Sequence, residues 1–370
     1  MKNFSKIYKY FLILFFKIYY GKLVFKNFDE KKYLSTKIVK IKNNNYKIYE
    51  INNCRVYTNT IDVAFIKNNH VLEKPSFQVR GNKYVKVTKN IVFTKGTPKF
   101  KKKINNRVFS LLSGVDASNN YYHWFFYCLP RFFLLSKFYK FNKNDFFLVP
   151  STKHNYQKQS LNLLKISNLL DASNLKHIEA DKIVCIDCVG KNIVDPSKPS
   201  FLKHQAKWLV KDFKFYFKKE MSVRSRKNNL KIYINRTGLS NVTRDITNKN
   251  DLIYYLKNNN FKIVDPSKLD FLKQIELFKS SRLIVGRHGA GLTNVIFCKK
   301  GTKIIELNNK NTENLYKNII KAFDLNYYSL NSNMVVSNGT KKPWDGSINI
   351  DIKKLSKVIS YPYVLDSYKQ

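Results

Sequence analysis

The stretch RLIVGRHGAGLTNVIFCKKGTKIIEL, residues 282–307, decides the fold of the C-terminal half of this chain. Its two short apolar runs, RLIVG and KIIEL, have the length and β-branched composition of buried strands. Between them lie a histidine, three glycines and an apolar segment that is typical of a helix. The stretch therefore predicts a strand, a glycine-rich turn, a helix and a second strand.

The same alternation continues on both sides of this stretch. Strands are expected at 231–234, 261–265, 282–286, 303–307 and 327–330, and helices around 250–258, 268–280 and 313–324 and from near Gly289. Strands that alternate with helices form parallel sheets through right-handed crossovers. The C-terminal half is therefore predicted to be a Rossmann-like domain.

The N-terminal half has a less regular pattern. Short β-branched runs between residues 37 and 94, ending with NIVFT at 90–94, are expected to be strands. An aromatic helix from 119 to 131, a strand at 145–150 and a helix from residue 155 follow, which indicates a first α/β domain. The helix that starts at residue 204 runs into a basic linker, so we place the domain boundary near residue 225.

The predicted organisation has four parts. They are a basic, aromatic segment at 1–36, an N-terminal α/β domain with a strand-rich start at 37–224, a Rossmann-like domain at 225–340, and a C-terminal tail or helix at 341–370. The first segment has an uninterrupted apolar run of only six residues, at 11–16, whereas a bilayer span needs about 20. It is expected either to lie on a membrane surface or to pack on the body as a first helix.

Charge is the unusual property of the composition. The 68 Lys and Arg residues against 25 Asp and Glu give a net charge of +43, which favours polyanions or anionic bilayers as partners. The bias of an AT-rich genome towards lysine codons is an equal explanation. The tract KFKKK at 99–103 is interpreted as a solvated face.

The cysteines indicate a reducing compartment. Five of them are spread through 370 residues, which is not a disulfide framework. Cys185 and Cys188 have CxxC spacing but lie in an apolar strand-like run without a histidine pair or a second CxxC. Buried structural thiols are favoured over a redox or metal site.

The glycine-rich turn has a chemical use in such a fold. In open parallel sheets, ligands bind at the carboxyl ends of the strands, where loops lead into helix N-termini. Glycine lets backbone N–H groups approach a ligand closely, and the first turn of the helix carries partial positive charge. The expected ligand is a phosphate. The alternative is a tight turn in which His288 is merely hydrogen-bonded.

Three further residues are expected at the same sheet edge. Arg236 and Arg244 follow the first strand of this half, and Glu306 ends the strand at 303–307. Two guanidinium groups would bind a diphosphate through charge-assisted hydrogen bonds. Glu306 could accept hydrogen bonds from two ribose hydroxyls, or it could be an ordinary acid at the end of a strand. The glycine spacing G-x-x-G-x-G does not favour a nicotinamide dinucleotide.

Three segments together resemble glycosyltransferase family 61. They are NNYYHWFFYCLPRFFLL at 119–135, INRTGLSNVTRDITNKNDL at 234–252, and RHGAGLTNVIFCKKGTKIIEL with the preceding LFKSSRLIVG, and they follow one another along the chain in the order of that family. The resemblance would make 37–224 the acceptor-side domain and 225–340 the nucleotide-sugar-binding domain. The resemblance covers roughly residues 119–330. It implies a GT-B architecture, two Rossmann-like domains with parallel sheets facing a cleft, and an inverting transfer that needs no metal and no cofactor beyond a nucleotide-sugar co-substrate.

The resemblance also implies site residues. The donor site would comprise Arg236, Arg244, His288, Gly289, Ala290, Gly291, Thr293, Asn294 and Glu306. The catalytic candidates are His123 and Asp116, and Tyr122, Trp124 and Arg131 would line the cleft. His123 would serve as base or acceptor anchor, because imidazole titrates near neutral pH; a core histidine among aromatic rings is the alternative.

The function implied is transfer of a sugar, from a UDP-linked donor in preference to other nucleotides, to a glycan or lipid-linked glycan acceptor in surface or capsular polysaccharide synthesis. The expected location is cytoplasmic, either free or at the inner face of an anionic membrane. A non-enzymatic polyanion or nucleic-acid binder is the alternative from charge, although no specific nucleic acid is expected. A degenerate transferase scaffold stays open because Tyr127 and Lys249 occupy positions where family members often carry acids.

Overall fold

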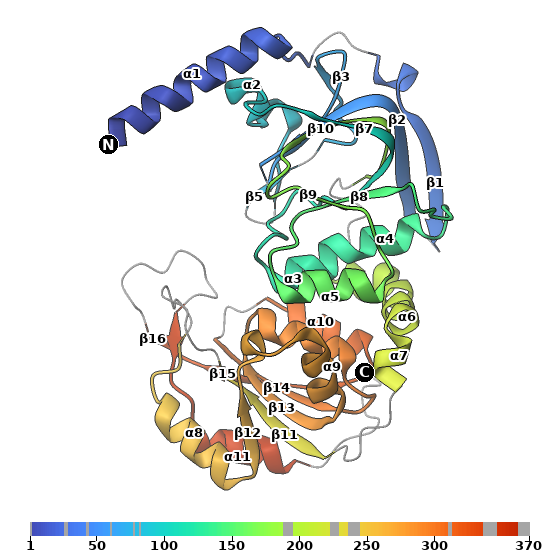
Figure 1. The fold of residues 1–370 in the computed structure, drawn as a ribbon. Helices are drawn as coiled ribbons and strands as arrows, with labels where there is room; N and C mark the ends of the chain where they lie inside the picture. The colour runs from blue at the N-terminus through green and yellow to red at the C-terminus, as the bar shows by residue number, and fades with distance from the viewer. Residues whose placement is uncertain are drawn as a thin grey trace. The chain divides into compact units, whose positions relative to one another are not determined.

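The computed structural model describes residues 2–25, 29–41, 44–59, 61–76, 78–80, 83–187, 195–222, 229–235, 245–309, 313–335 and 346–361. The chain divides into two compact units, Met1–Val194 and Asp195–Gln370. Each unit is built around its own large sheet (Figure 1).

The C-terminal unit contains five parallel strands in the order β12-β11-β13-β14-β15. The strands are β11 (Leu230–Ile234), β12 (Phe261–Val264), β13 (Ser281–Arg287), β14 (Lys303–Asn309) and β15 (Asn326–Ser332), with a small hairpin of β16 (Met334–Val335) and β17 (Ser347–Ile348). The helical segments are η4 (Phe201–Gln205), α6 (Ala206–Tyr216), α7 (Lys218–Ser222), α8 (Lys249–Asn258), η5 (Pro266–Lys268), α9 (Phe271–Lys279), η6 (Ala290–Phe297), α10 (Leu315–Ala322) and α11 (Ile352–Ser360). The predicted parallel α/β alternation is confirmed.

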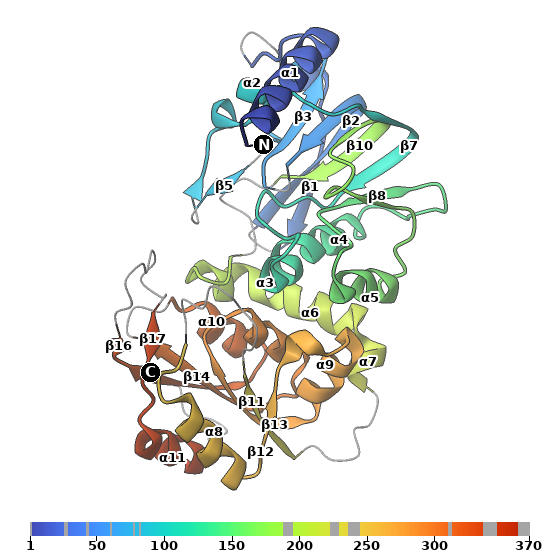
Figure 2. The same ribbon diagram turned by 60° about the vertical axis from the view of Figure 1, so that its left-hand side comes forward.

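Helices cover both faces of this sheet (Figures 1 and 2). On one face, Leu252 of α8 and Leu355 of α11 belong to the same apolar core as Val285 of β13. On the other face, the rings of Phe271 in α9 and Phe297 in η6 meet edge to face, with centroids 5.6 Å apart. The result is a three-layer α/β/α unit whose strand order, counted from β11, is 2-1-3-4-5.

The predicted C-terminal helix is α11, and it is fastened to the sheet by a buried lysine. Nζ of Lys303 donates to the carbonyl oxygens of Val358 and Tyr361, at 2.6 and 2.9 Å. These carbonyls belong to the last turn and end of α11, where a cation is favourable. Burial lowers the pKa of Lys303. The helix is therefore part of the C-terminal unit.

The N-terminal unit contains an eight-stranded sheet in the order β4-β3-β2-β10-β7-β8-β9, with β1 paired to β2. Its strands are β1 (Ser35–Ile41), β2 (Asn44–Thr58), β3 (Val63–Lys67), β4 (His70–Val71), β7 (Lys102–Ser110), β8 (Phe146–Val149), β9 (Leu169–Asp171) and β10 (His177–Ile186), and β5 (Val79–Arg80) pairs with β6 (Lys83–Tyr84). The helical segments are α1 (Lys2–Tyr20), η1 (Glu30–Lys32), η2 (Val87–Lys89), α2 (Val92–Lys95), α3 (Tyr121–His123), η3 (Trp124–Cys128), α4 (Leu129–Leu135) and α5 (Asn155–Leu163). No helix within the described ranges combines the length and the apolar character needed to cross a bilayer.

The large sheet of the N-terminal unit is mixed, which differs from the prediction of a second parallel sheet. Strands β10, β7, β8 and β9 are parallel, and helices α3 to α5 connect β7 to β8 and β8 to β9. Strand β2 instead pairs antiparallel with β1, β3 and β10. Short connections such as the one between β1 and β2 allow only antiparallel pairing, whereas parallel neighbours need a crossover.

The run NIVFT at 90–94 is not a strand, so that prediction is wrong. Residues Val92–Lys95 form helix α2, and the side-chain oxygen of Asn90 accepts a hydrogen bond from the N–H of Val92, at 3.1 Å. Gly96, with φ of 63°, ends the helix in a conformation that suits glycine. Local capping therefore outweighs the β propensity of the run.

The predicted boundary near residue 225 falls inside the C-terminal unit, because helices α6 and α7 belong to that unit. Phe213 of α6 lies 6.3 Å from Phe323 after α10, and Phe217 lies 5.7 Å from Phe297 of η6, measured between ring centroids. These aromatic contacts hold α6 against the layer of helices that includes η6 and α10. The basic linker at 223–228 lies outside the described residues.

Cys185 agrees with the interpretation as a structural thiol. It is 2% exposed within β10, and burial raises its pKa well above the usual value. A thiol that stays protonated is a poor nucleophile and a poor metal ligand. Cys188 lies outside the described residues.

His177 makes the stability of the N-terminal unit depend on pH. Its Nδ1 lies 2.8 Å from the carbonyl oxygen of Lys99, and the rings of Tyr20 and Tyr57 lie beside it. Burial is the main cause that lowers the pKa of His177 from 6.5 to about 4. Between these two values the unfolded chain binds a proton that the folded chain does not bind. The free energy of unfolding should therefore fall by about 3 kcal/mol in total as the pH drops from 6.5 towards 4.

Chemical unfolding of the wild type and of His177→Gln at pH 7, 5.5 and 4.5 measures this effect. Glutamine can still donate to the carbonyl oxygen of Lys99 but does not titrate. The stability difference between the two proteins should shrink or reverse in acid. A difference that stays constant across the three pH values would contradict the prediction.

Candidate functional site

The glycine-rich loop lies between β13 and η6, at the carboxyl end of the central strand β13. In a sheet of order 2-1-3-4-5, the strand order reverses between the first and third strands, here β11 and β13. Ligands of open α/β sheets bind outside the carboxyl ends of the strands at such a switch point. The fold therefore brings the loop that follows β13 to the place where this architecture binds ligands.

Close packing explains the two glycines that flank this loop, Gly286 in β13 and Gly291 in η6. A methyl group on Gly286 would lie 3.2 Å from Cδ1 of Ile234 and 3.3 Å from Cδ2 of Leu292. A methyl group on Gly291 would lie 3.1 Å from Cγ2 of Ile234. These separations are shorter than ordinary van der Waals contact, so glycine lets η6 lie directly against the end of β11.

A buried chain of three side chains lies under this loop. His288 follows β13, and its Nδ1 lies 2.6 Å from Oε1 of Glu306 on the neighbouring strand β14. The hydroxyl of Tyr327 on β15 donates to Oε2 of the same carboxylate, at 2.8 Å. Glu306 has no exposed surface and His288 is 7% exposed. The residue after β13 and one residue each of the neighbouring parallel strands β14 and β15 thus form a continuous hydrogen-bonded chain.

The chain orients the histidine. The pKa of Tyr327 is raised, first by burial and then by the charge of Glu306, so its hydroxyl stays protonated and continues to donate. With Nδ1 directed at Glu306, the imidazole presents Nε2 away from the carboxylate. The ring of Tyr316 in α10 meets the His288 ring edge to face, with centroids 5.1 Å apart, which fixes the ring plane.

Asn308 extends this chain along β14. Its Nδ2 lies 3.4 Å from the hydroxyl of Tyr327 and 3.3 Å from Oγ of Ser329, and the residue is 4% exposed. Because side chains alternate along a strand, Asn308 and Glu306 lie on the same face. Sequence reasoning did not single out Tyr327, Asn308 or Tyr316. For Tyr327, the only signal in the sequence was its position at the start of the predicted strand that follows the strand of Glu306.

The structure favours a different role for Glu306 from the predicted ribose contact. Both carboxylate oxygens are engaged inside the protein, by His288 and Tyr327. A fully buried carboxylate that is hydrogen-bonded in this way holds the histidine in a fixed orientation. The residue is at the predicted edge of the sheet, but it acts from beneath the loop.

The other predicted loop residues divide into two groups. Thr293 and Asn294 are buried, with Thr293 Oγ1 3.4 Å from the hydroxyl of Tyr316 and Asn294 Nδ2 donating to Oε1 of Gln274 at 3.0 Å. They hold η6 against α9 and α10. Gly289 is buried, whereas Ala290 and Gly291 are partly exposed and form the first turn of η6.

The predicted diphosphate arginines, Arg236 and Arg244, lie outside the described residues. The described residues end at Asn235, whose backbone N–H donates to the carbonyl of Val264 at 2.7 Å, and resume at Asp245. Asn235 directly follows β11, so the described residues reach the carboxyl end of that strand.

In the N-terminal unit, the predicted catalytic residues His123 and Asp116 lie together. Nδ1 of the half-buried His123 is 3.1 Å from the backbone carbonyl oxygen of Asp116, and the Asp116 carboxylate accepts from the N–H of Asn119 at 3.3 Å. A carbonyl can only accept, so Nδ1 carries the proton and the ring lone pair is on Nε2. His123 has the tautomer that a general base of this kind requires.

The helix that carries His123 has an irregular turn with a sequence cause. From Tyr121 to Leu135 the chain is helical, but Trp124–Cys128 form a π-helical turn in which the N–H of Leu129 donates to the carbonyl of Trp124. Pro130 follows directly. It lacks an N–H and its ring would clash with the carbonyl four residues earlier, and the wider π turn accommodates both defects.

Trp124 and Arg131 are not exposed, which corrects their prediction as cleft-lining residues. Trp124 has no exposed surface, and its indole N–H donates to Oγ of Ser160 in α5 at 2.9 Å. Arg131 is 5% exposed, its Nε donates to the carbonyl of Leu112 at 2.8 Å, and burial lowers its pKa to about 10. Tyr122 is also buried, and its ring stacks on that of Phe126, with centroids 5.1 Å apart. The aromatic side chains of this helix therefore pack in the core of the N-terminal unit.

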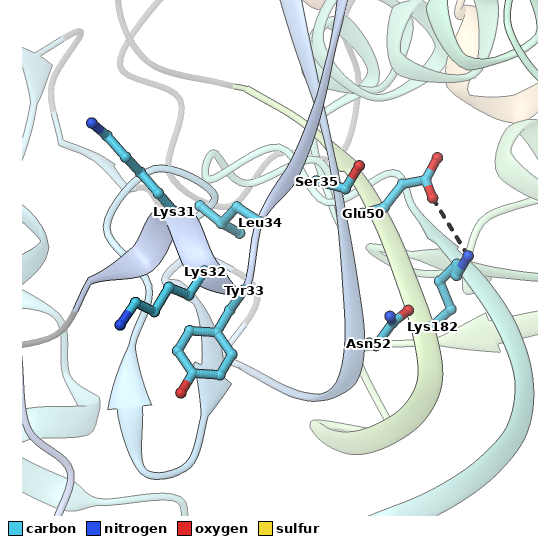
Figure 3. A pocket seen from close by; sticks show the side chains of 8 residues that line it. All are labelled: Lys31, Lys32, Tyr33, Leu34, Ser35, Glu50, Asn52 and Lys182. Atoms are coloured by element: carbon cyan, nitrogen blue, oxygen red, sulfur yellow. Dashed lines mark hydrogen bonds and ion pairs between the residues drawn. The ribbon is translucent and has the colours of Figure 1, made fainter.

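A pocket of about 440 Å³ lies elsewhere in the N-terminal unit (Figure 3). It is lined by Lys31, Lys32, Tyr33, Leu34, Ser35, Glu50, Asn52 and Lys182. The Glu50 carboxylate pairs with Lys37 and with Lys182, the latter at 3.5 Å, and accepts from the Tyr139 hydroxyl at 2.6 Å. Burial raises the pKa of Glu50, but the hydrogen bonds from Lys37 and Tyr139 outweigh it and lower the pKa. The pocket contains none of the predicted site residues, and the protein's own cations already balance its acid.

The fold and the loop define the C-terminal unit as a Rossmann-like α/β unit. Its glycine-rich loop lies at the switch point, where such sheets bind their ligands. A family model described as Glycosyltransferase 61 matches residues 121–305, half of the chain. The chain belongs to the glycosyltransferase 61 family. The match spans both the helix of His123 and the loop of His288, and it ends within β14, one residue before Glu306.

Two curated proteins are similar over a shorter stretch. The EGF domain-specific O-linked N-acetylglucosamine transferase of Gallus gallus is 32% identical over 89 residues, and the protein of the same name from Drosophila melanogaster is 29% identical over 87 residues. Each alignment covers 23% of this chain and 17% of the relative. The chain therefore matches about a sixth of the length of these relatives.

Proposed function

We propose that this protein is an inverting glycosyltransferase that transfers a sugar from a UDP-linked donor to a glycan acceptor in polysaccharide synthesis. The observation that carries the proposal is the buried chain of His288, Glu306 and Tyr327 under a glycine loop at the switch point of a family 61 sheet. The names of the similar proteins, which are N-acetylglucosamine transferases, support a UDP-linked sugar in preference to other donors.

The chemistry proposed for the donor side is charge stabilisation. In the reaction, the bond between the anomeric carbon and the diphosphate oxygen breaks as the acceptor oxygen attacks from the opposite side of the sugar. Negative charge grows on the departing diphosphate, and fixed donors aimed at it lower the barrier. His288 would donate through Nε2 in its doubly protonated form, with Glu306 as the counter-charge. Arg236, Arg244 and the partly exposed first turn of η6 would supply the other donors without a metal ion.

The chemistry proposed for the acceptor side is proton removal. The acceptor hydroxyl loses its proton as its oxygen bonds to the anomeric carbon, and a base with a pKa near neutrality suits this step. His123 carries its proton on Nδ1, towards the carbonyl of Asp116, so that the lone pair on Nε2 can take the proton. The carboxylate of Asp116 is the second candidate for this role.

Thermal unfolding in the presence of nucleotides tests the donor proposal. A ligand that binds only the folded protein raises the melting temperature by mass action, by an amount that grows with its concentration relative to Kd. UDP and UDP-linked sugars should stabilise the wild type at moderate salt more than the guanosine and cytidine diphosphates do. Arg236→Ala should remove the shift, and Lys268→Ala, which changes an exposed lysine of η5, should keep it.

The same panel distinguishes the alternatives. Heparin and mixed-sequence DNA test binding by charge alone, which collapses as salt is raised. If these polyanions stabilise the protein and no nucleotide does, the glycosyltransferase proposal fails and a polyanion-binding function takes its place. If UDP binds but no acceptor is glycosylated in a mixture of lipid-linked glycans, a degenerate transferase is indicated.

A further inference from the structure

Helix α1 exposes a stripe of large apolar side chains. Ile7, Phe11, Leu14, Phe15 and Ile18 are between 44% and 76% exposed, and they recur at intervals of three and four residues. This spacing places them on one face of the helix. We call these five residues the outer stripe. Monomeric proteins rarely leave a contiguous apolar surface of this kind uncovered.

The opposite face of α1 is attached to the N-terminal unit near the end of the helix. Phe16 is 4% exposed, and its ring meets that of Phe100 edge to face, with centroids 4.9 Å apart. The carbonyl of Tyr20 accepts from Nδ2 of Asn69 at 2.8 Å, and its hydroxyl accepts from the N–H of Lys101 at 2.9 Å. Packing therefore fixes which face of α1 turns inward, and the exposure of the outer stripe shows that it lies on the side away from the core. Figures 1 and 2 show α1 next to α2 in the N-terminal unit.

The basic tract KFKKK at 99–103 lies beside the outer stripe. The ring of Phe100, itself 66% exposed, lies 6.3 Å from that of Phe15 and 6.0 Å from that of Tyr19. The lysines of this tract are exposed, and Lys101 pairs with Glu179 at 2.5 Å. Two segments about eighty residues apart in the sequence thus form one surface with an apolar centre and a cationic edge, which we call the α1 surface.

We propose that the α1 surface binds an anionic phospholipid bilayer, with α1 lying in the plane of the interface. The outer stripe would enter the boundary between headgroups and acyl chains, and exposed tyrosines such as Tyr8 and Tyr19 would sit at headgroup level. Lys102 and Lys103 would contact the acidic headgroups, to which the net charge of +43 attracts the whole chain.

Charge decides between a bilayer and a second copy of the chain as the occupant. Two copies that paired through their outer stripes would bring two lysine tracts and two proteins of charge +43 together. Like charges brought together in this way repel each other, whereas an anionic bilayer complements the same lysines. The lipid occupant is therefore favoured.

Vesicle co-sedimentation tests this proposal, with no nucleotide present, so that its outcome is independent of the proposed enzymatic function. The probe is vesicles of phosphatidylcholine alone or with one-third phosphatidylglycerol. The wild type should sediment with the anionic vesicles and stay in solution with the neutral ones. Phe11→Ser with Ile18→Ser should weaken the partition at least tenfold, while Phe215→Ser with Tyr254→Ser, which removes two equally exposed rings of the C-terminal unit, should leave it unchanged.

A second pair of variants separates the lysine tract from the general basicity of the chain. Lys102→Gln with Lys103→Gln should weaken anionic-vesicle binding several-fold more than Lys262→Gln with Lys268→Gln, which removes the same charge from exposed sites elsewhere. Melting temperatures should be unchanged in all four variants. The proposal is overturned if the wild type stays in solution with anionic vesicles, or if the outer-stripe variant binds as the wild type does. A second copy of the chain would be the occupant instead if two results were found together. The wild type would be a dimer by ultracentrifugation and the outer-stripe variant a monomer, and neither of these two proteins would bind vesicles.

Discussion

Glu306→Ala is expected to lower the free energy of unfolding by about 2–6 kcal/mol, because each of two buried groups that lose their partner costs about 1–3 kcal/mol. The substitution leaves the buried His288 imidazole and the Tyr327 hydroxyl without their shared acceptor. It also leaves a cavity beneath the loop, because Glu306 has no exposed surface. Denaturant unfolding measured on the purified variant gives the value directly.

Two further variants show whether the loss comes from the hydrogen-bonded chain. Tyr327→Phe removes one donor and should lower the free energy of unfolding by about 1 kcal/mol. Glu306→Gln keeps the volume of the side chain, and its loss of stability should lie between those of Tyr327→Phe and Glu306→Ala. Glu276→Ala removes an exposed acid from α9 and should change stability by less than about 0.5 kcal/mol. A Glu306→Ala protein as stable as the Glu276→Ala control would refute the chain as a structural element.

His288→Ala is expected to weaken binding of the nucleoside diphosphate roughly ten- to hundredfold, which corresponds to about 1.5–3 kcal/mol for a hydrogen bond to a charged group. The reason is geometric. Glu306 and Tyr316 fix the ring so that Nε2 is the atom presented to a ligand, and this order is established before the ligand arrives. Calorimetric titration of UDP into the folded variant measures the change.

A comparison of UDP with uridine isolates the phosphate contribution. His288→Ala should weaken UDP binding but leave uridine binding unchanged, because the imidazole is proposed to contact only the diphosphate. His204→Ala, which changes a half-buried histidine of η4, is the matched control and should bind both as the wild type does. If His288→Ala binds UDP with the wild-type Kd, the histidine is a packing residue and the donor site lies elsewhere.

The two predictions concern different atoms of one chain of contacts. Stability depends on Nδ1 of His288 and on both oxygens of Glu306, which are engaged in the protein. Ligand binding depends on Nε2 and on the first turn of η6. A variant that changes stability without changing UDP affinity, or the reverse, therefore separates the structural half of the site from the half that is proposed to meet the donor.

Much of the C-terminal unit could be predicted because its signals are local. Apolar runs of strand length alternate with amphipathic helices, and parallel strands require such crossovers. That alternation is sufficient to place Glu306 and the His288 loop at one edge of the sheet. The mixed sheet of the N-terminal unit could not be predicted in the same way, because the direction in which β2 pairs with β10 depends on residues more than a hundred positions apart.

The sequence by itself determined the family, the parallel sheet of the C-terminal half and the edge on which its loops gather, since these follow from motif order and from short-range periodicity. Only the tertiary structure decided that Glu306 is sealed beneath His288 with Tyr327 as its second partner, that Trp124 and Arg131 face the core, and that KFKKK lies beside α1. Each of these depends on cross-strand register or on packing between distant segments. Such contacts form only when non-local elements meet, so residue type and spacing along the chain do not specify them.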